Sequence, residues 1–225
     1  ILWLLEELQQ PFELRLIDIR KPEARADPDF VAASPMGKVP AIMDRAPNGV
    51  VHVADSAAIG LYLADRYPAA GLAPAIDDPR RGAYLYWMTY TPGVIEPAMA
   101  EKFNNWQVSR ASCGWGNFPT MIEVLEKGLA PGPWLLGEQF SAADVLVGSS
   151  VYFMKIFGVL PDSPVLAAYA ERCLARPAYA KALAREIAKR PPVATRLIIE
   201  AVDDGIQAPI DQALEIETRA FDKVL

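Results

Sequence analysis

Two short sequences in the first third of the chain carry groups suited to a peptide-like ligand. Val39-Pro40 lies between a short helix and a hairpin, where a cis proline would leave the Val39 N–H and C=O free to pair with a peptide. Asp55-Ser56 begins an expected helix, whose backbone donors favour a carboxylate, while Ser56 adds a hydroxyl and Asp55 a partner for an ammonium group. Together the two sequences suit an α-amino-acid head group. Each also has an ordinary explanation, a trans proline that begins a strand and a simple helix N-cap.

Composition argues against several other kinds of chemistry. The 225 residues include one histidine, His52, and two cysteines, Cys113 and Cys173, so no zinc or other thiolate–imidazole metal site is expected. No G-x-S-x-G turn accompanies His52, which argues against a Ser-His-Asp hydrolase. The net charge of −6 argues against nucleic acid as a partner, and no uncharged stretch is long enough to span a membrane. The few cysteines and the lack of a signal peptide predict a cytoplasmic protein.

Residues 1–68 are expected to alternate helices and strands. Apolar residues from Ile1 to Leu8 recur at helical spacing, and Phe12, Leu14 and Leu16 alternate with charged residues, as in a strand that continues through Ile19. The later signals predict a short helix from Asp27-Pro28, a hairpin of Ala41–Met43 and Val50–Val53, and a helix from Asp55-Ser56 to Tyr67-Pro68. The predicted order is therefore helix, strand, helix, strand, strand, helix.

The rest of the chain is expected to be helical. A helix through Tyr84 and Tyr90 should kink at Pro92-Gly93, and Ser141 and Asp144 have the spacing of a capping box. Further helices are predicted over 119–129, from Ser163-Pro164, from Arg176-Pro177, and over 194–202 and 210–224.

Five segments occur in the order and spacing of a known family. They are Ile1–Leu8, Ser34–Pro40, Asp55–Ile59, Leu63–Pro68 and Ser141–Asp144. On these segments residues 1–183 resemble a bacterial cytosolic glutathione transferase. The resemblance implies an α+β thioredoxin-like domain over residues 1–68, lacking its first strand, then an all-α helical domain over residues 79–182, in a homodimer.

The resemblance also implies an enzyme that uses glutathione as co-substrate and joins its thiolate to a small hydrophobic electrophile. Carried over by position, Val39 and Pro40 hold the cysteinyl backbone, Asp55 and Ser56 hold the γ-glutamyl end, and Lys38 meets the glycyl carboxylate. The family's catalytic Ser, Tyr or Cys follows its first strand. This places the catalytic residue upstream of Ile1, so its identity is unknown here, and no metal is implied.

The electrophile would lie against aromatic residues of the helical domain. The candidates are Tyr90, Phe103, Trp106 and Trp115, although aromatic residues at helical spacing more often belong to a core. Two other functions stay open. One is a non-catalytic scaffold for protein partners, inactive because the catalytic loop is absent, and the other is a glutathione-dependent reductase or dehalogenase.

The end of the chain, residues 183–225, has a different resemblance. It is similar to the last helices of the enoyl-CoA hydratase/isomerase family, whose β-spiral core nothing here can supply, so no hydratase activity is expected. The alternative is an amphipathic extension in which Ile210, Leu214 and Phe221 share one face.

Overall fold

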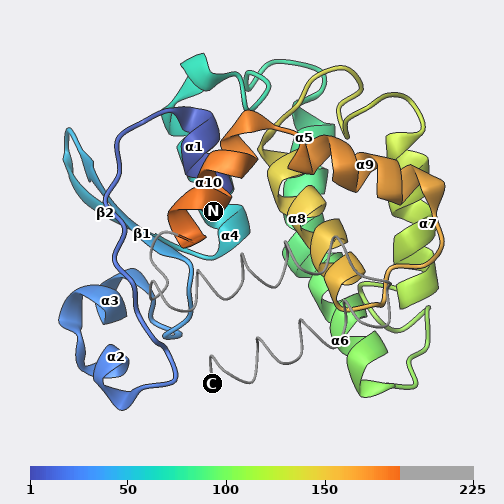
Figure 1. Cartoon of the computed structure of the whole chain (residues 1–225), viewed down its shortest axis with the longest axis horizontal. Helices are drawn as coiled ribbons and strands as arrows, with labels where there is room; N and C mark the ends of the chain where they lie inside the picture. The colour runs from blue at the N-terminus through green and yellow to red at the C-terminus, as the bar shows by residue number, and fades with distance from the viewer. Residues whose placement is uncertain (188–225) are drawn as a thin grey trace, which may run out of the picture. The chain divides into compact units, whose positions relative to one another are not determined.

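The computed structural model describes residues 1–187, and Figure 1 shows the order of the elements. The chain divides into two units, Ile1–Tyr179 and Ala180–Leu225. In the second unit the described residues are the last part of α10 (Pro177–Ile187). The helices predicted over 194–202 and 210–224 lie outside the described residues.

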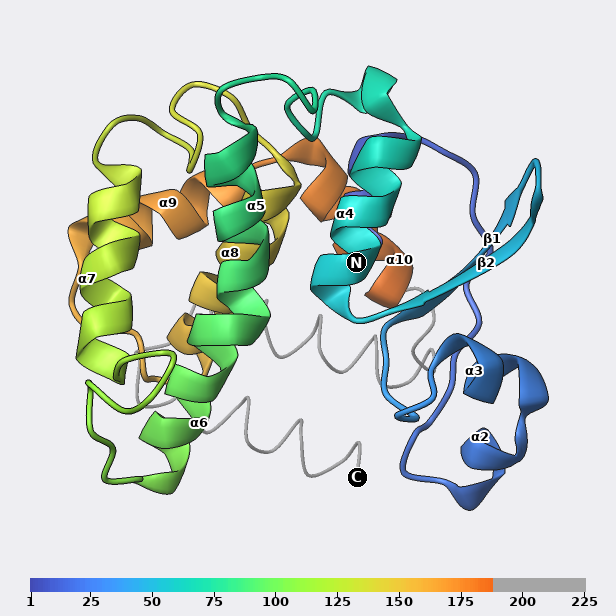
Figure 2. The same cartoon turned by 180° about the vertical axis from the view of Figure 1, so that it is seen from behind.

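The first part of unit 1 is a small α/β arrangement. Its elements are α1 (Leu2–Leu8), α2 (Pro22–Ala26), α3 (Pro28–Ala33), β1 (Ala41–Ala46), β2 (Gly49–Ala54) and α4 (Ser56–Arg66). The two strands form an antiparallel hairpin in which Ala41 faces Ala54 and Ala46 faces Gly49. Helix α4 lies against this hairpin, and the Tyr62 hydroxyl on α4 donates to Asp44 of β1 at 2.6 Å (Figure 2).

The strand predicted from Phe12 through Ile19 is wrong. Residues 10–18 form neither helix nor strand, and no ladder among the described residues includes them. Alternation placed Leu14 and Leu16 on a buried face, yet Leu16 is 69% exposed. A strand requires a neighbour that satisfies its backbone groups, which the alternation alone does not provide. The chain is instead held by the ion pair between Arg15 and Asp27, and a short helix, α2, follows it.

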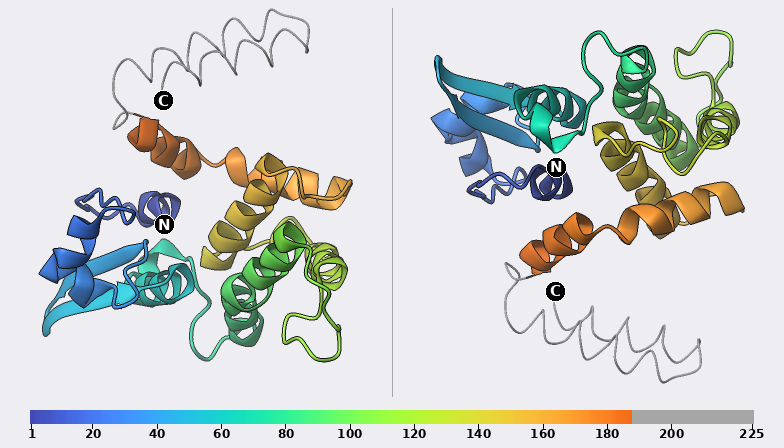
Figure 3. Two further views of the ribbon diagram at one scale, coloured as in Figure 1. Left: turned by 90° about the horizontal axis from the view of Figure 1, so that it is seen from below. Right: turned by 90° about the horizontal axis from the view of Figure 1, so that it is seen from above.

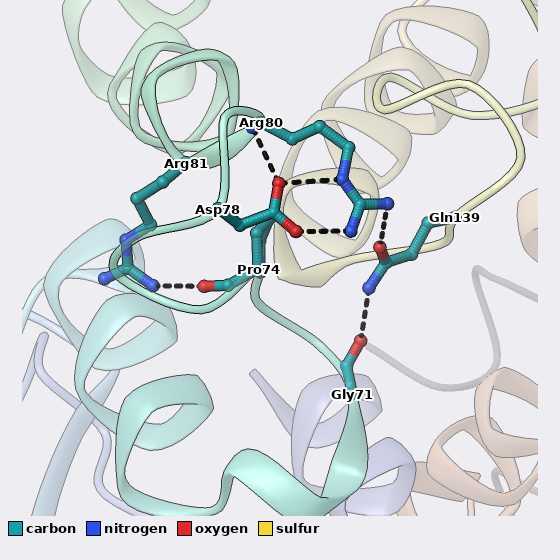
Figure 4. A network of polar contacts seen from close by, with 6 residues as sticks. All are labelled: Gly71, Pro74, Asp78, Arg80, Arg81 and Gln139. Carbon is teal, nitrogen blue, oxygen red and sulfur yellow. Dashed lines mark hydrogen bonds and ion pairs between the residues drawn. The ribbon is translucent and has the colours of Figure 1, made fainter.

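A turn-rich linker joins this part to the helices. It begins with the 3₁₀ turn η1 (Pro68–Ala70) and ends at α5 (Arg81–Tyr90). Figure 4 shows how it is fixed: Asp78 accepts three hydrogen bonds from Arg80, and Gln139 bridges Arg80 and the Gly71 carbonyl. The linker is therefore tied to the segment that precedes α8.

The helical part begins with one long bent column. Helix α5 passes into a π-helical turn, η2 (Thr91–Ile95), and then into α6 (Glu96–Asn104), which confirms the kink predicted at Pro92-Gly93 (Figure 2). Proline lacks an N–H and clashes with the carbonyl four residues earlier, so the helix widens there. The Glu96 N–H consequently bonds to the Thr91 carbonyl, one residue beyond the α-helical spacing.

Three complete helices of unit 1 follow α6. They are α7 (Phe118–Leu129), α8 (Ala142–Ile156) and α9 (Pro164–Leu174), and α8 packs between α5 and α9 (Figure 3). The predicted capping box is confirmed at the start of α8. The fully buried Asp144 carboxylate accepts from the Leu135 and Ser141 N–H groups and from the Ser141 and Tyr169 hydroxyls. Burial raises the pKa of Asp144, and these donors oppose that rise.

None of the helices in the described part of the chain is both long and apolar enough to cross a membrane.

Candidate functional site

The hairpin register brings together the two sequences that were expected to bind a ligand. Because Ala41 is paired with Ala54, the residues just beyond them, Pro40 and Asp55, leave the same end of the hairpin side by side. Opposed residues of an antiparallel pair have Cα atoms about 4.5 to 5.5 Å apart. Val39-Pro40 and Asp55-Ser56 therefore border one site, although 15 positions separate Pro40 from Asp55 in the sequence.

The Val39-Pro40 peptide bond is cis, which decides between the two readings of this proline. Val39 is 51% exposed, and within residues 1–187 no hydrogen bond uses its N–H or its C=O. Lys38 is exposed and has no ion pair in the same range. One backbone donor, one backbone acceptor and one cationic side chain are thus available to a ligand.

Asp55 caps helix α4 from an unusual backbone conformation, with φ 77° and ψ 134°. Its Oδ1 atom accepts from the Ala57 N–H at 2.8 Å and from the Ala58 N–H at 3.4 Å. Its Oδ2 atom and the Ser56 hydroxyl have no hydrogen-bond partner in the described chain. The Asp55-Ser56 sequence is therefore both a helix cap and an open set of polar groups.

A second carboxylate from the helical part lies near Asp55. Burial, and after it the charge of Asp55, raises the pKa of Glu96 above its ordinary value. No ion pair of Glu96 with a cation occurs among the described residues. Sequence reasoning missed Glu96, because its electrostatic interaction with Asp55 depends on the packing of α6 and has no local signal.

The four aromatic candidates are divided by the structure. Phe103, Trp106 and Trp115 gather around the end of α6 and the loop after it. The Trp106 N–H bonds to the Glu101 carbonyl, and the Trp115 indole donates to the Glu101 carboxylate at 2.9 Å. Tyr90 is buried on α5, where its hydroxyl donates to the Met121 carbonyl at 3.2 Å and burial raises its pKa.

Phe103 also belongs to an aromatic cluster that sequence reasoning missed. Its ring meets Phe157 edge-on at 5.8 Å, and Phe157 stacks with Phe153 at 6.3 Å. All three rings are about half exposed.

Fewer observations support a ligand site elsewhere in the described part of the chain. A cavity of about 680 Å³ lies along the loop of residues 15–27, but Arg15 and Arg20 on its wall are already paired with Asp27 and Asp18. It includes none of the predicted site residues. In the part of the chain that the structure describes, no three His, Cys, Asp or Glu side chains gather closely enough to hold a metal ion.

The comparisons with known proteins agree with this architecture. A family model described as "Glutathione S-transferase, N-terminal domain" matches residues 1–66, and "Glutathione S-transferase, C-terminal domain" matches residues 64–172. These models do not reach residues 183–225, so the resemblance of that segment to enoyl-CoA hydratases stays a prediction.

Individual relatives cover most of the chain. "Disulfide-bond oxidoreductase YfcG" of Escherichia coli is 29% identical over 80% of this chain and 86% of that protein. A glutathione transferase structure from Methylococcus capsulatus has a TM-score of 0.66 at 28% identity and covers 82% of this chain and 91% of its own. A sphingomonad glutathione S-transferase complexed with glutathione has a TM-score of 0.64 at 28% identity, with the same coverage.

The thioredoxin-like arrangement with its cis proline, the all-helical part that follows it, and the two matching models show that the chain belongs, over residues 1–172, to the glutathione S-transferase family.

Proposed function

We propose that the chain binds glutathione at the end of the hairpin, between Val39-Pro40 and Asp55-Ser56. The observation that carries this proposal is the register of β1 and β2, which sets these two sequences side by side. Glutathione has an α-amino-acid head group, a central cysteinyl peptide and a glycyl carboxylate. Each end requires a different partner, and the hairpin end offers one for each.

The head group fits the start of α4. Its carboxylate would take the N–H and the hydroxyl of Ser56, because Asp55 already accepts from the Ala57, Ala58 and Ile59 N–H groups, while its ammonium would lie against Asp55 Oδ2. Glu96 adds negative charge on the same side. The cysteinyl backbone would pair with the N–H and C=O of Val39, as a strand pairs with a peptide. Lys38, which is exposed, would meet the glycyl carboxylate.

The reaction we propose is transfer of the glutathione thiolate to a small hydrophobic electrophile. The sulfur forms a bond to an electrophilic carbon, a leaving group departs with its electron pair, and the thiol proton passes to solvent. A free thiol titrates near 8.5, so the site must favour the anion. We assign no catalytic residue. Of the four aromatic candidates, Phe103, Trp106 and Trp115 are at least partly exposed, whereas Tyr90 is buried, so these three are the stronger walls for the electrophile.

A second candidate is reduction of disulfides, and the likeness to YfcG favours it. A glutathione thiolate would attack one sulfur of the substrate disulfide and release a thiol. A second glutathione would then resolve the mixed disulfide, giving glutathione disulfide and the second thiol. Cys173 is an unsuitable nucleophile, because burial raises its pKa to about 12. Turnover of hydroxyethyl disulfide rather than 1-chloro-2,4-dinitrobenzene, with glutathione present, would favour this candidate.

The assembly and limits of the domains belong to the same proposal. We propose a homodimer, with a glutathione-binding domain over residues 1–68 and a helical domain over residues 79–182. The matches over residues 1–66 and 64–172 support this division. Sedimentation equilibrium of the purified chain tests the dimer.

The first test is calorimetric titration of the chain with glutathione at pH 7. We expect saturable binding that Asp55→Ala weakens by about 1.5 to 3 kcal/mol, the range for hydrogen bonds to charged groups. Asp55→Asn keeps an oxygen for the cap but loses the charge, so it should weaken binding while the melting temperature stays unchanged. Asn117→Ala removes a comparable cap, that of α7, far along the chain, and serves as the control.

Unchanged affinity in Asp55→Asn would reduce Asp55 to a helix cap. No glutathione binding by folded wild-type protein would instead favour the scaffold.

A further inference from the structure

One buried hydroxyl anchors the loop that carries Lys38 and Val39. Ser34 is 1% exposed, although it lies in a loop whose Met36, Lys38 and Val39 are exposed. Its Oγ donates to the Lys38 carbonyl at 2.8 Å and accepts from the Lys38 N–H at 3.0 Å. The two bonds join Ser34 to both backbone groups of Lys38 and so close the loop of residues 34–38.

The rest of the loop depends on this anchor. The Ser34 N–H ends α3 by bonding to the Phe30 carbonyl, and its own carbonyl accepts from the Gly37 N–H at 2.8 Å. Gly37 has φ 62°, a conformation that glycine adopts without strain. Ser34 thus joins the end of a helix, a turn and the residue before Val39.

The bond to the Lys38 carbonyl has a geometric consequence for Val39. The Lys38 C=O and the Val39 N–H belong to one planar trans peptide, so they point in opposite directions. Because Ser34 draws the carbonyl inward, the Val39 N–H must point away from Ser34. That N–H has no acceptor among residues 1–187. Ser34 therefore fixes the direction of the very donor that the glutathione site requires.

We propose that Ser34 is a positioning residue of the glutathione site, which holds the Lys38–Val39 peptide in the orientation that pairs with the cysteinyl backbone. This inference rests on the proposed function for the identity of the ligand, but the anchoring of the loop is a separate property that can be measured without ligand. Ser34 itself does not contact glutathione.

Three substitutions distinguish the effect of the Ser34 hydrogen bonds from the effect of its side-chain volume. Ser34→Ala removes both bonds, Ser34→Cys keeps the volume but bonds weakly, and Ser34→Thr keeps the hydroxyl. Ser150→Ala is the matched control, because Ser150 is also buried and its hydroxyl donates to the Leu146 carbonyl at 3.0 Å, within α8.

The first measurement is the rate of tryptic cleavage after Lys38, followed by mass spectrometry without ligand. We expect faster cleavage at this bond in Ser34→Ala and Ser34→Cys, and the wild-type rate in Ser34→Thr and Ser150→Ala. The second is the affinity for glutathione, which should fall about tenfold in Ser34→Ala and Ser34→Cys, as expected for two lost hydrogen bonds. In steady-state assays the loss should fall on KM for glutathione more than on kcat.

Wild-type rates of cleavage after Lys38 in Ser34→Ala and Ser34→Cys, together with unchanged affinity, would overturn the proposal. Faster cleavage with unchanged affinity would also overturn it, because Ser34 would then hold the loop without serving the site. If the wild-type chain binds no glutathione, the proposed function fails, and faster cleavage in Ser34→Ala alone would still show that Ser34 anchors the loop.

Discussion

Asp55 caps helix α4 and, in the proposed site, binds the ammonium group of the ligand, yet its backbone conformation is strained. A non-glycine residue at φ 77° and ψ 134° lies outside the allowed regions and costs of the order of 1 to 3 kcal/mol. The two hydrogen bonds from Ala57 and Ala58 to its carboxylate offset part of this cost. Such strain persists where the surrounding structure enforces it and tends to occur at functional sites. A residue chosen for stability alone would be glycine.

We therefore expect Asp55→Gly to separate stability from binding. Glycine adopts this conformation freely, and replacing an N-cap with glycine costs only a few tenths of a kcal/mol, so the melting temperature should rise by about 2 to 4 °C. Glutathione affinity should fall as in Asp55→Ala, because the carboxylate is lost. Calorimetric melting and titration of the same samples check both parts. A melting temperature that falls in Asp55→Gly would show that the cap outweighs the strain.

Asp78 provides a test of pH dependence. Hydrogen bonds from Arg80 lower the pKa of Asp78 to about 2. Since the folded-state pKa lies below the ordinary value, the pair contributes stability at pH values above that ordinary value and loses it as the pH falls toward 2. Carboxyl NMR should show Asp78 titrating near pH 2 in the wild type and at a higher pH, closer to its ordinary value, in Arg80→Met, which keeps the backbone N–H bond to Asp78 but loses the guanidinium bonds.

Asp18 is the internal control for that titration, because Arg20 lowers its pKa to about 2 in a different loop. Its midpoint should not move in Arg80→Met. An unmoved Asp78 midpoint in that variant would show that Arg80 does not cause the shift.

Single residues were predictable where their signal is local. Val39-Pro40 is marked by its own proline, and Asp55-Ser56 is marked by the start of a helix, and both signals can be read from neighbouring residues in the sequence. Ser34 and Glu96 have no such signal. Ser34 matters because its hydroxyl meets the backbone four residues later, and Glu96 matters because a different helix brings it to Asp55.

Among the elements, helix starts followed from the sequence better than strands did. Asp27, Ser141 and Ser163 each cap a helix as predicted, since a cap depends on a few neighbouring residues. The hairpin predicted from Ala41–Met43 and Val50–Val53 is likewise confirmed. The strand from Phe12 failed because a strand depends on a partner far away in sequence. The alternation of apolar and charged residues is a property of one segment, whereas a β-ladder requires two paired strands.

Close helix packing gives a prediction at this scale. A Cβ atom built on Gly128 of α7 would lie 2.3 Å from the Trp87 ring, and one built on Gly60 of α4 would lie 2.6 Å from the end of Met88. The Met88 methyl can move aside, whereas Trp87 is packed between other rings, Tyr86 and Tyr90.

Both Gly→Ala changes gain about 1 kcal/mol of helix propensity. We expect Gly60→Ala to leave the unfolding free energy nearly unchanged, while Gly128→Ala lowers it by about 1 to 3 kcal/mol through overpacking. Urea denaturation of the two variants checks the difference. Equal stability would mean that Trp87 is free to rotate.

At the scale of the whole unit, the ion pair between Glu7 and Arg176 joins its two parts. The Arg176 guanidinium forms a bidentate pair with Glu7 at 2.5 and 2.8 Å and lies 3.5 Å from the centre of the Phe140 ring. Trp3 donates to the same Glu7 carboxylate. Glu7 belongs to α1 and Arg176 precedes α10, so the contact links residues 169 positions apart.

Breaking the Glu7–Arg176 ion pair should lower the free energy of unfolding. We expect Arg176→Met to lower the unfolding free energy by about 3 kcal/mol, the low end for a buried pair, because Arg176 keeps 28% of its side chain exposed. Glu7→Gln with Arg176→Met together should cost less than the two changes summed. Arg20→Met removes an exposed pair with Asp18 and should have almost no effect. Additive losses in the double variant would show that Glu7 and Arg176 do not act as a pair.

The Arg176–Glu7 contact also sets an order of events during synthesis. A ribosome adds about 5 to 20 residues per second, so α1 emerges roughly 10 to 30 s before Arg176. For most of that interval Trp3, Leu4 and Leu8, which are buried in the finished protein, lack helix α8, which packs on α1. Helix α1 is thus made long before α8, which packs on it, and until then the growing chain carries an exposed apolar stripe that a chaperone is expected to bind.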